Sequence, residues 1–275
     1  MFLVTGSNGQ LGNCLRLLLG DNAVYVDKDE LDITDFDAVQ KFCAGNKFTT
    51  IINCAAYTAV DKAEDDEKIA RLINAVGPAN LAQTGIPLVH ISTDYVYDGT
   101  NCRPYVETDT PNPRSAYGRT KLEGEKLVMQ YASTCIIIRT AWLYSEFGHN
   151  FVKTMRRLGA ERPTLNVVFD QCGTPTYAGD LAQAIVNILP QLTPETKEIF
   201  HFSNEGVCSW YDFAVEIMRL SNLPCQVMPI ESKDYPTSAV RPHYSVLNKH
   251  KIKSTFGLSV NHWKESLITC LQKLS

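Results

Sequence analysis

The chain has little of what marks membrane proteins and nucleic-acid-binding proteins. No apolar run approaches the ~20 residues of a membrane-spanning helix, so no membrane association is expected. No basic tract occurs, and 26 lysine and arginine residues nearly balance 30 aspartate and glutamate residues, so nucleic acid is not expected as a partner. With 275 residues, the chain can bury a full core, as one large domain or as a principal domain with a smaller lobe.

The cysteines also lack the pattern of a disulfide framework or a zinc site. They number nine, are scattered along the chain and include no Cys-x-x-Cys pair. Such usage is typical of reduced thiols, which predicts a cytoplasmic protein. Residues 2–4 already read as a strand, so no signal peptide is expected.

A glycine-rich turn lies close to the N-terminus. The apolar run Phe2-Leu3-Val4 precedes Thr5-Gly6-Ser7-Asn8-Gly9-Gln10-Leu11-Gly12, after which leucines recur at helical spacing. This order predicts a strand, a glycine turn and a helix. The N–H groups at the start of such a helix are open to a pyrophosphate, because glycine carries no side chain to block the approach. A tight turn without a ligand is the competing interpretation.

Asp27 favours the ligand-binding interpretation of this turn. Residues 23–26 read as the next strand, and Asp27 follows them about twenty residues after the first glycine of the turn. A carboxylate at this point can accept hydrogen bonds from the adenosine ribose hydroxyls. Asp27 suits NADH, whereas Lys28 could neutralise the 2′-phosphate of NADPH, so the sequence predicts a dinucleotide site that takes NADPH or NADH.

Tyr117 and Lys121 are separated by one helical turn in a segment that reads as a helix. At this spacing the phenol and the ammonium share a face, and a neighbouring cation favours the phenolate. The pair could therefore move a proton at neutral pH. Taken alone, the spacing more often marks an aromatic–lysine surface pair, by roughly three to one.

The first half of the chain alternates strand-like and helix-like segments. Strands are expected at 2–4, 23–26, 50–53, 87–92 and 135–139, and helices near 35–45, 66–84 and 115–132. Near-continuous apolar strands separated by helices predict an α/β fold, a Rossmann-type doubly wound parallel sheet. We expect a dinucleotide-binding domain over 1–145 and a smaller substrate-binding lobe over 146–275, interwoven with the first. In the second half, strands are expected at 165–169 and 199–202 and helices at 178–189, 209–220 and 261–273.

Together these motifs resemble the dTDP-4-dehydrorhamnose reductases, a family of the extended short-chain dehydrogenase/reductase superfamily. The resemblance runs from Thr5-Gly6 to Arg241-Pro242 and so covers nearly the whole chain. It rests on the glycine turn and on the runs at 53–64, 92–99, 116–121, 139–144, 150–151 and 170–176. The family implies NAD(P)H-dependent reduction of the C4 ketone of dTDP-4-dehydro-6-deoxy-L-mannose to dTDP-L-rhamnose, a precursor of cell-surface polysaccharide.

The resemblance also implies a role for each matching residue. Tyr117 delivers the proton to the sugar oxygen, Lys121 lowers the pKa of the phenol and binds the nicotinamide ribose, and Thr93 offers its hydroxyl to the same oxygen. The other residues expected to bind the cofactor are Gly6, Ser7, Asn8, Gly9, Gln10, Leu11, Gly12, Asp27, Asp32, Ile33, Ala55, Ala56 and Tyr57. Those expected to contact the substrate are Thr93, Asp94, Trp142, Asn150 and Arg241. Core packing is the competing interpretation of Trp142, and His90 reads as structural.

Three alternatives to this activity differ in what they require of the chain. Related 4,6-dehydratases carry a glutamate where this chain has Tyr95, and a phenol of ordinary pKa is a poor base, so dehydration is disfavoured. Another nucleotide-sugar reductase or epimerase would use the same Tyr117 and Lys121. A non-catalytic regulatory subunit of methionine adenosyltransferase would need neither, so the intact pair argues against it.

The remaining expectations concern assembly and metal. Some relatives form homodimers, and a homodimer is therefore allowed here. Some of these dimers hold magnesium with acidic residues near the C-terminus. Residues 249–275 contain one acid, Glu265, so no metal site is expected.

Overall fold

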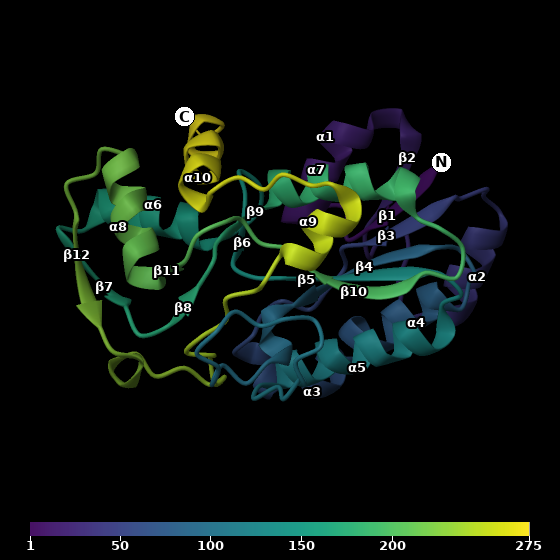
Figure 1. Cartoon of the computed structure of the whole chain (residues 1–275), viewed down its shortest axis with the longest axis horizontal. Coiled ribbons are helices and arrows are strands. Elements are labelled where there is room, and N and C mark those ends of the chain that lie inside the picture. Colours follow the sequence, from purple (N-terminus) through teal and green to yellow (C-terminus); the bar gives the residue numbers. More distant parts are fainter. Residues whose placement is uncertain (275) are drawn as a thin grey trace.

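The computed structural model describes residues 1–274 and is built around a six-stranded sheet (Figure 1). The strands lie in the order β10-β5-β4-β3-β1-β2, and every neighbouring pair is parallel. The predicted strands of the first half are confirmed, with small shifts at their ends. The strands are β1 (Phe2–Thr5), β2 (Ala23–Val26), β3 (Thr50–Asn53), β4 (Leu88–Thr93), β5 (Cys135–Thr140) and β10 (Lys197–His201).

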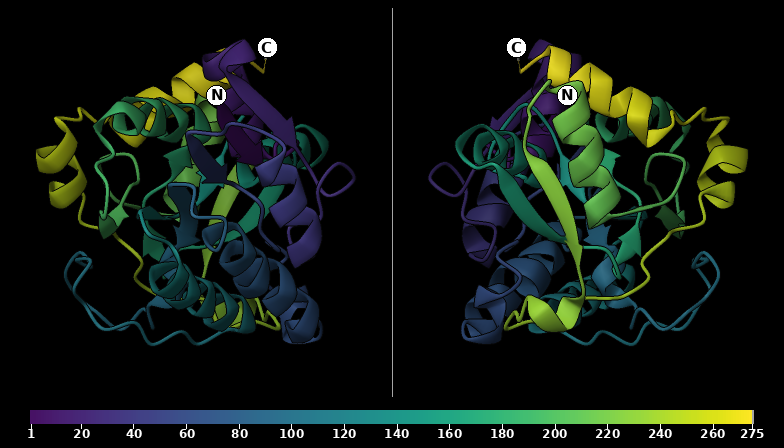
Figure 2. Two further views of the ribbon diagram at one scale, coloured as in Figure 1. Left: turned by 90° about the vertical axis from the view of Figure 1, so that its right-hand side faces the viewer. Right: turned by 90° about the vertical axis from the view of Figure 1, so that its left-hand side faces the viewer.

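Helices cover both faces of this sheet (Figures 1 and 2), which confirms the doubly wound α/β fold. One face packs against α1 (Gln10–Leu19), α7 (Ala178–Ile188) and α9 (His250–Phe256). The other packs against α2 (Phe36–Ala44), α4 (Gly77–Ala82) and α5 (Ala116–Tyr131). The single helix expected near 66–84 is divided into α3 (Glu67–Arg71), a π-helical turn (Leu72–Val76) and α4.

The strand order reverses at β1, since β2 lies on one side of it and β3 on the other. In a parallel sheet every strand ends at the same edge, and the loops that follow β1 and β3 diverge at the point of reversal. The glycine turn follows β1 directly, so the topology places it in this crevice. The fold therefore brings the predicted cofactor motif to the edge where open α/β sheets bind ligands.

The second half of the chain forms a separate core around a parallel pair of strands, drawn at the left of Figure 1. Its longer elements are α6 (Phe151–Glu161), β7 (Thr164–Val168), α8 (Trp210–Leu220), β12 (Gln226–Ile230) and α10 (Trp263–Gln272). Two-residue strands form two further pairs, β6 (Leu143–Tyr144) with β9 (Thr176–Tyr177) and β8 (Cys172–Gly173) with β11 (Cys208–Ser209). Short 3-10 turns lie at Gly20–Asn22, Lys62–Glu64, Asp94–Val96, Leu189–Gln191 and Ser232–Asp234.

The domain boundary at residue 145 stays a prediction. Segments from the second half of the chain also contribute to the first domain. The elements α7, β10 and α9 come after residue 146, yet they pack on the six-stranded sheet. The expected helices at 178–189, 209–220 and 261–273 are present as α7, α8 and α10. The elements α6, α9 and β12 were not expected.

A buried ion pair fixes α5 to the sheet. Glu125 of α5 and Arg139 of β5 are both 2% exposed and form two hydrogen bonds, of 2.9 and 2.6 Å. Ser92 donates to the Glu125 carboxylate, and Arg139 also donates to the hydroxyl of Tyr97 at 2.7 Å. A buried charge is tolerated only when its partners are complete, so this cluster specifies how α5 sits on β4 and β5.

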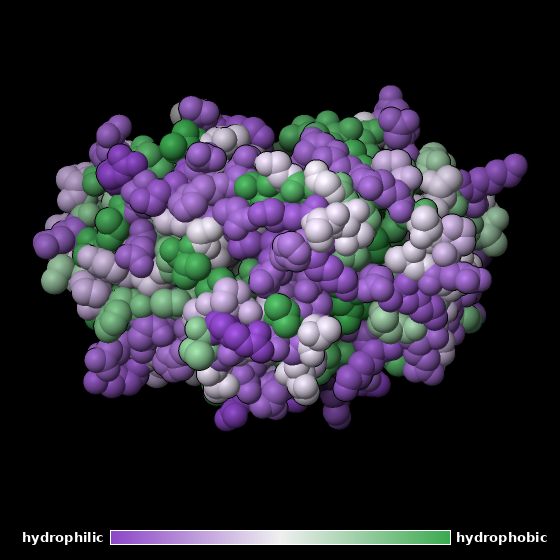
Figure 3. All heavy atoms as spheres, in the orientation of Figure 1, coloured by the Kyte–Doolittle hydropathy of each residue, from purple (hydrophilic) through white to green (hydrophobic). Residues whose placement is uncertain are grey.

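No helix within residues 1–274 is long and apolar enough to cross a membrane. On the face drawn in Figure 3, hydrophilic side chains predominate, and the apolar ones form scattered patches between them.

We expect Glu125→Ala to lower the free energy of unfolding by about 3–5 kcal/mol, because it leaves the Arg139 guanidinium buried without its counter-ion. Urea unfolding measured on the purified protein checks this. Glu123→Ala is the matched control on the same helix, since Glu123 pairs with Arg71 at the surface and its loss should cost at most about 1 kcal/mol. Equal losses in the two variants would contradict the assignment.

Candidate active site

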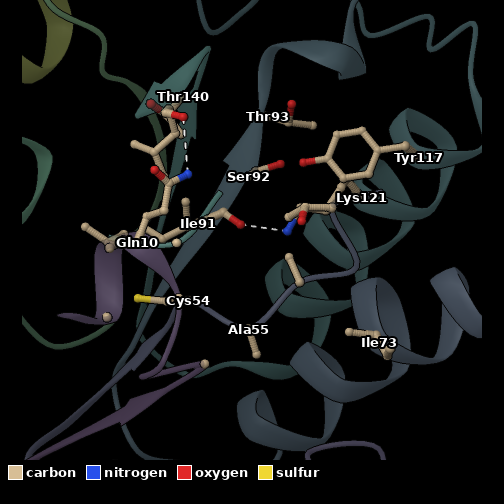
Figure 4. Close-up of a pocket in the computed structure, with 18 of the residues that line it drawn as sticks. Gln10, Cys54, Ala55, Ile73, Ile91, Ser92, Thr93, Tyr117, Lys121 and Thr140 are labelled. Atoms are coloured by element: carbon tan, nitrogen blue, oxygen red, sulfur yellow. Dashed lines mark hydrogen bonds between the residues drawn. The ribbon is translucent and has the colours of Figure 1, made fainter. Parts of the chain in front are cut away.

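A cavity of about 940 Å³ lies at the carboxyl edge of the sheet. Its wall contains the turn after β1, the loops after β2 and β3, the ends of β4 and β5, and one face of α5. Figure 4 shows Thr93, Tyr117 and Lys121 side by side on this wall, with Gln10 and Ala55 across the cavity from them. The expected residues that line the cavity are Gly6, Gly9, Gln10, Leu11, Gly12, Asp27, Asp32, Ile33, Ala55, Ala56, Thr93, Asp94, Tyr117, Lys121 and Trp142.

The three positions Gly6, Gly9 and Gly12 of the turn are occupied by glycine for different structural reasons. Gly6 has a φ of +64°, and a Cβ there would lie 2.5 Å from the backbone nitrogen of Ala55. A Cβ on Gly12 would lie 2.5 Å from the Cα of Ser7. Gly9 is different, because its added Cβ would meet only the Gly6 carbonyl, at 3.2 Å. Two glycines are thus required by the fold, while Gly9 leaves the N-terminus of α1 open toward the cavity, as a bound pyrophosphate requires.

Asp27 fastens this turn to the end of β2. Its carboxylate accepts hydrogen bonds from the backbone N–H groups of Asn8 and Lys28, each at 2.9 Å. The side chain remains on the cavity wall, beside the exposed Lys28. A ribose hydroxyl that bonds to Asp27 would therefore meet a carboxylate already held in place by the backbone.

Tyr117 and Lys121 project from the first turns of α5, whose N-terminus is capped by Ser115. Lys121 is 1% exposed, and its Nζ donates to the carbonyl of Ile91 at 2.7 Å (Figure 4). Burial lowers the pKa of Lys121 to about 8. Burial also raises the pKa of Tyr117 above its ordinary value, and the hydroxyl of Thr93 opposes this rise. In this arrangement the phenol therefore keeps its proton, and the effect of burial outweighs the lowering expected from Lys121.

Thr93 and Asp94 stand at the end of β4. The Thr93 hydroxyl donates to Asp94 Oδ1 at 3.0 Å, whereas Asp94 Oδ2 is buried without a hydrogen-bond partner among residues 1–274. Burial raises the pKa of Asp94 to about 6, and the nearby hydroxyls of Ser245 and Thr93 oppose this rise. An unpaired buried acceptor on a cavity wall is costly unless a ligand group donates to it.

Trp142 has a backbone conformation rare for a bulky residue, with a φ of +49°. Its indole stacks on that of Trp210, with centroids 3.6 Å apart and planes at 11°. A Cβ on Gly173 would lie 2.7 Å from the Trp142 ring. Strain of this kind persists only where the surroundings enforce it and clusters at ligand sites. Sequence reasoning missed Trp210, because no local pattern connects it to Trp142.

Five expected residues lie outside the cavity wall. Ser7 and Asn8 belong to the glycine turn, and the Tyr57 hydroxyl donates to Asp66. Asn150 caps α6 by accepting from the N–H of Lys153, and its amide donates to Gln10. Arg241 pairs with Asp61 and donates to the hydroxyl of Tyr95 at 3.2 Å.

Tyr95 lines the cavity next to Tyr117, with the two rings edge to face at 5.5 Å. Burial raises the pKa of Tyr95 to about 12, in spite of the nearby Arg241. A phenol of this pKa is a poor base at neutral pH.

Apolar wall residues of α3 and the π-helical turn were not singled out in the sequence. They are Ile69, Leu72 and Ile73, whose spacing signals a helix face but does not indicate that the face borders a cavity.

Comparison with known proteins places the chain among nucleotide-sugar reductases. The dTDP-4-dehydrorhamnose reductase of Aggregatibacter actinomycetemcomitans is 43% identical, covering 96% of each chain. The crystal structure of a dTDP-4-dehydrorhamnose reductase from Clostridium acetobutylicum has 46% identity and a TM-score of 0.95, covering 99% of each chain. A dTDP-4-dehydrorhamnose reductase from Bacillus anthracis, crystallised in complex with NADP, has 38% identity and a TM-score of 0.95, covering 99% of this chain and 98% of its own. The model of the RmlD substrate binding domain matches residues 1–275, and the chain therefore belongs to that family.

Proposed function

We propose that this protein reduces the C4 ketone of dTDP-4-dehydro-6-deoxy-L-mannose to give dTDP-L-rhamnose, using NADPH or NADH. The observation that carries the proposal is the placing of Thr93, Tyr117 and Lys121 on one cavity wall, opposite an open glycine turn. That arrangement gives a proton donor, a hydroxyl and a cation around a space beside a dinucleotide-type turn. The family membership of the whole chain supports the same activity.

The residues of the turn fit a nicotinamide dinucleotide. The N-terminus of α1 and Gly9 would hold the pyrophosphate, Asp27 the adenosine ribose and Lys121 the nicotinamide ribose. Lys28 is exposed next to Asp27 and would meet a 2′-phosphate, which supports use of both cofactors. When bound, the reduced nicotinamide supplies the hydride for the ketone carbon.

The chain's own residues supply the proton and stabilise the developing charge. Tyr117 transfers its phenolic proton to the C4 oxygen, and its raised pKa ensures that the proton is present at neutral pH. Thr93 donates to the same oxygen after giving up its bond to Asp94. The unpaired Asp94 Oδ2 accepts from a sugar hydroxyl, and Trp142 packs against the sugar ring.

The cavity opposes two competing activities. Dehydration of a dTDP-glucose needs a base that removes the C5 proton, and the high pKa of Tyr95 disfavours this. A purely structural role, such as a regulatory subunit, would not require the buried Lys121 or the unpaired Asp94. A 4-epimerase would share Tyr117 and Lys121. The assay below distinguishes it from a reductase, because a reductase consumes the reduced cofactor and does not convert UDP-glucose to UDP-galactose.

We also propose a cytoplasmic location and a homodimer. All nine cysteines are free thiols, and six of them are buried, which suits a reducing compartment. Sedimentation velocity on the purified protein tests the dimer.

The decisive assay supplies dTDP-4-dehydro-6-deoxy-L-mannose with NADPH and, separately, with NADH. We expect stoichiometric loss of absorbance from either reduced cofactor and formation of dTDP-L-rhamnose, identified by NMR. Two control reactions should give nothing: dTDP-glucose alone, and UDP-glucose as a source of UDP-galactose. A 4-keto sugar formed from dTDP-glucose without added reductant would overturn the proposal, as would co-purification with a partner enzyme in the absence of any cofactor oxidation.

Gly9→Val should abolish NADPH binding while the protein remains folded. The valine side chain would occupy the approach of the pyrophosphate, whereas the only close backbone atom is the Gly6 carbonyl oxygen. Fluorescence titration with NADPH measures the affinity, and circular dichroism verifies the fold. Gly45→Val is the control, because Gly45 lies after α2, has an ordinary backbone conformation and does not line the cavity. Unchanged affinity in a folded Gly9→Val protein rules out this cofactor site.

Tyr117→Phe should slow hydride transfer by roughly 10²–10⁴-fold, the range for loss of a general acid, with NADPH affinity largely kept. Single-turnover kinetics isolate this step from product release. Lys121→Met is the matched variant one helical turn away, and it should lower both the rate and the cofactor affinity. Near-normal turnover of Tyr117→Phe is incompatible with the proposed proton transfer.

A further inference from the structure

A row of buried polar side chains crosses three neighbouring strands and ends at Lys121. In the parallel register, Thr5 of β1 pairs with Asn53 of β3, and Asn53 pairs with His90 of β4. Thr5 is 1% exposed, and Asn53 and His90 are fully buried. The row continues to Lys121, whose Nζ lies 3.5 Å from Nε2 of His90. Because buried polar groups must find partners, the donors and acceptors along such a row determine one another.

The backbone fixes the orientation of the Asn53 amide. The N–H of Ala55 donates to Asn53 Oδ1 at 3.1 Å, and a backbone N–H can only donate, so this atom is the oxygen. The hydroxyl of Thr5 donates to the same oxygen at 2.7 Å. The amide nitrogen, which is also only a donor, therefore faces Nδ1 of His90 at 3.0 Å. Nδ1 must accept this bond and carries no proton.

The tautomer of His90 follows. Burial and the nearby Lys121 hold the pKa of His90 well below its ordinary value, so the ring is neutral and its proton is on Nε2. This N–H faces Lys121 Nζ, which also donates to the carbonyl of Ile91. A neutral amine satisfies both contacts, since its lone pair accepts from His90 while one N–H donates to Ile91. An ammonium has no lone pair, and one of its hydrogens would oppose the His90 proton.

We propose that His90 is a positioning residue whose fixed Nε2–H disfavours the ammonium form of Lys121 and thereby sets the pH above which Lys121 loses its charge. The inference rests on the proposed function only in that Lys121 is assigned to the nicotinamide ribose. It assigns His90, a residue of β4 that the sequence predicts to be structural, a role in the active site.

The other groups that face Lys121 raise or lower its pKa. Burial is the largest influence and lowers its pKa, whereas Glu125 on the same helix and Cys54 after β3 raise it. Glu125 is itself paired with Arg139 of β5. Tyr117, one turn earlier on α5, keeps its proton and adds no charge. The imidazole of His90 differs from these groups. A substitution at Asn53, which faces Nδ1, can change whether Nε2 donates to Lys121 or accepts from it.

The tautomer is measured directly by two-bond ¹H–¹⁵N correlation NMR on protein labelled at its six histidines, with His90 identified by its loss in His90→Phe. We expect the cofactor-free protein to show a neutral His90 protonated at Nε2 between about pH 6 and pH 9, a range across which free histidines titrate. A proton on Nδ1, or titration of His90 within this range, overturns the inference without any variant.

Asn53→Asp should exchange the donor and acceptor roles of the two nitrogens of His90. A carboxylate still accepts from Ala55 and Thr5 but cannot donate, so His90 should place its proton on Nδ1 and turn an unprotonated Nε2 toward Lys121. The added charge alone would also raise the pKa of Lys121, so the control is the double variant Asn53→Asp, His90→Phe, which keeps the carboxylate and removes the imidazole. NADPH affinity is measured against pH for both.

We expect the pH at which NADPH affinity falls to half to lie about one unit higher in Asn53→Asp than in the double variant, equivalent to tenfold weaker proton loss from Lys121. Coincident pH curves, or an Nε2 proton retained in Asn53→Asp, overturn the inference. The NMR result needs neither cofactor nor substrate. An Nε2 proton in a protein that reduces no sugar would therefore sink the proposed function alone, and an Nδ1 proton in an active reductase would sink this inference alone.

Discussion

The geometry of the active site depends on the buried pair between Glu125 and Arg139. Two charges that are 2% exposed demand complete hydrogen bonding, and they find it in each other, in Ser92 and in the hydroxyl of Tyr97. Glu125 lies on α5, whereas Ser92 lies on β4 and Arg139 on β5. The bonds between them therefore fix the position of the helix on the sheet. The same helix carries the proposed proton donor, Tyr117, just over two turns earlier, and Ser92 directly precedes Thr93. The pair thus fixes Tyr117 and Thr93 relative to each other on one wall of the cavity.

Burial at this edge also keeps the phenol of Tyr117 protonated, as reduction requires, while a pKa of about 8 leaves Lys121 mostly charged at neutral pH. Removing Tyr117 and Lys121 from water raises the pKa of the phenol and lowers that of the ammonium, so both shifts favour the neutral forms. A phenol that holds its proton is the correct starting state for a reductase, because the acceptor that forms on the ketone is an alkoxide, a far stronger base than a phenolate. The reverse oxidation would require the phenolate first and is opposed by the same burial.

Sequence patterns predicted those parts of the fold whose determinants are local. The strands at 23–26 and 50–53 are mostly apolar, Asp27 and Asn53 mark their carboxyl ends, and Gly6 and Gly12 stand where a side chain would meet the backbone. The site features that were missed depend on partners far along the chain. Trp142 stacks on Trp210, and Arg241 is paired with Asp61, although nothing near either residue encodes the contact. The strand Gln226–Ile230 carries a proline and is half exposed, so it lacks a strand-like pattern until it pairs with β7.

The second half of the chain completes the site by returning repeatedly to the sheet edge. Arg241 reaches back to Asp61 and Tyr95, which ties the segment before α9 to the loop after β3. Near the end of β5, the strained backbone of Trp142 is held because its carbonyl accepts from Thr176 and its indole lies between Trp210 and Gly173. These contacts come from three separate elements, β8, β9 and α8, which together hold the indole at the cavity. The cost of the left-handed conformation, about 1–3 kcal/mol, is offset only when the lobe is fully packed, and the substrate side of the cavity therefore forms only with the intact fold.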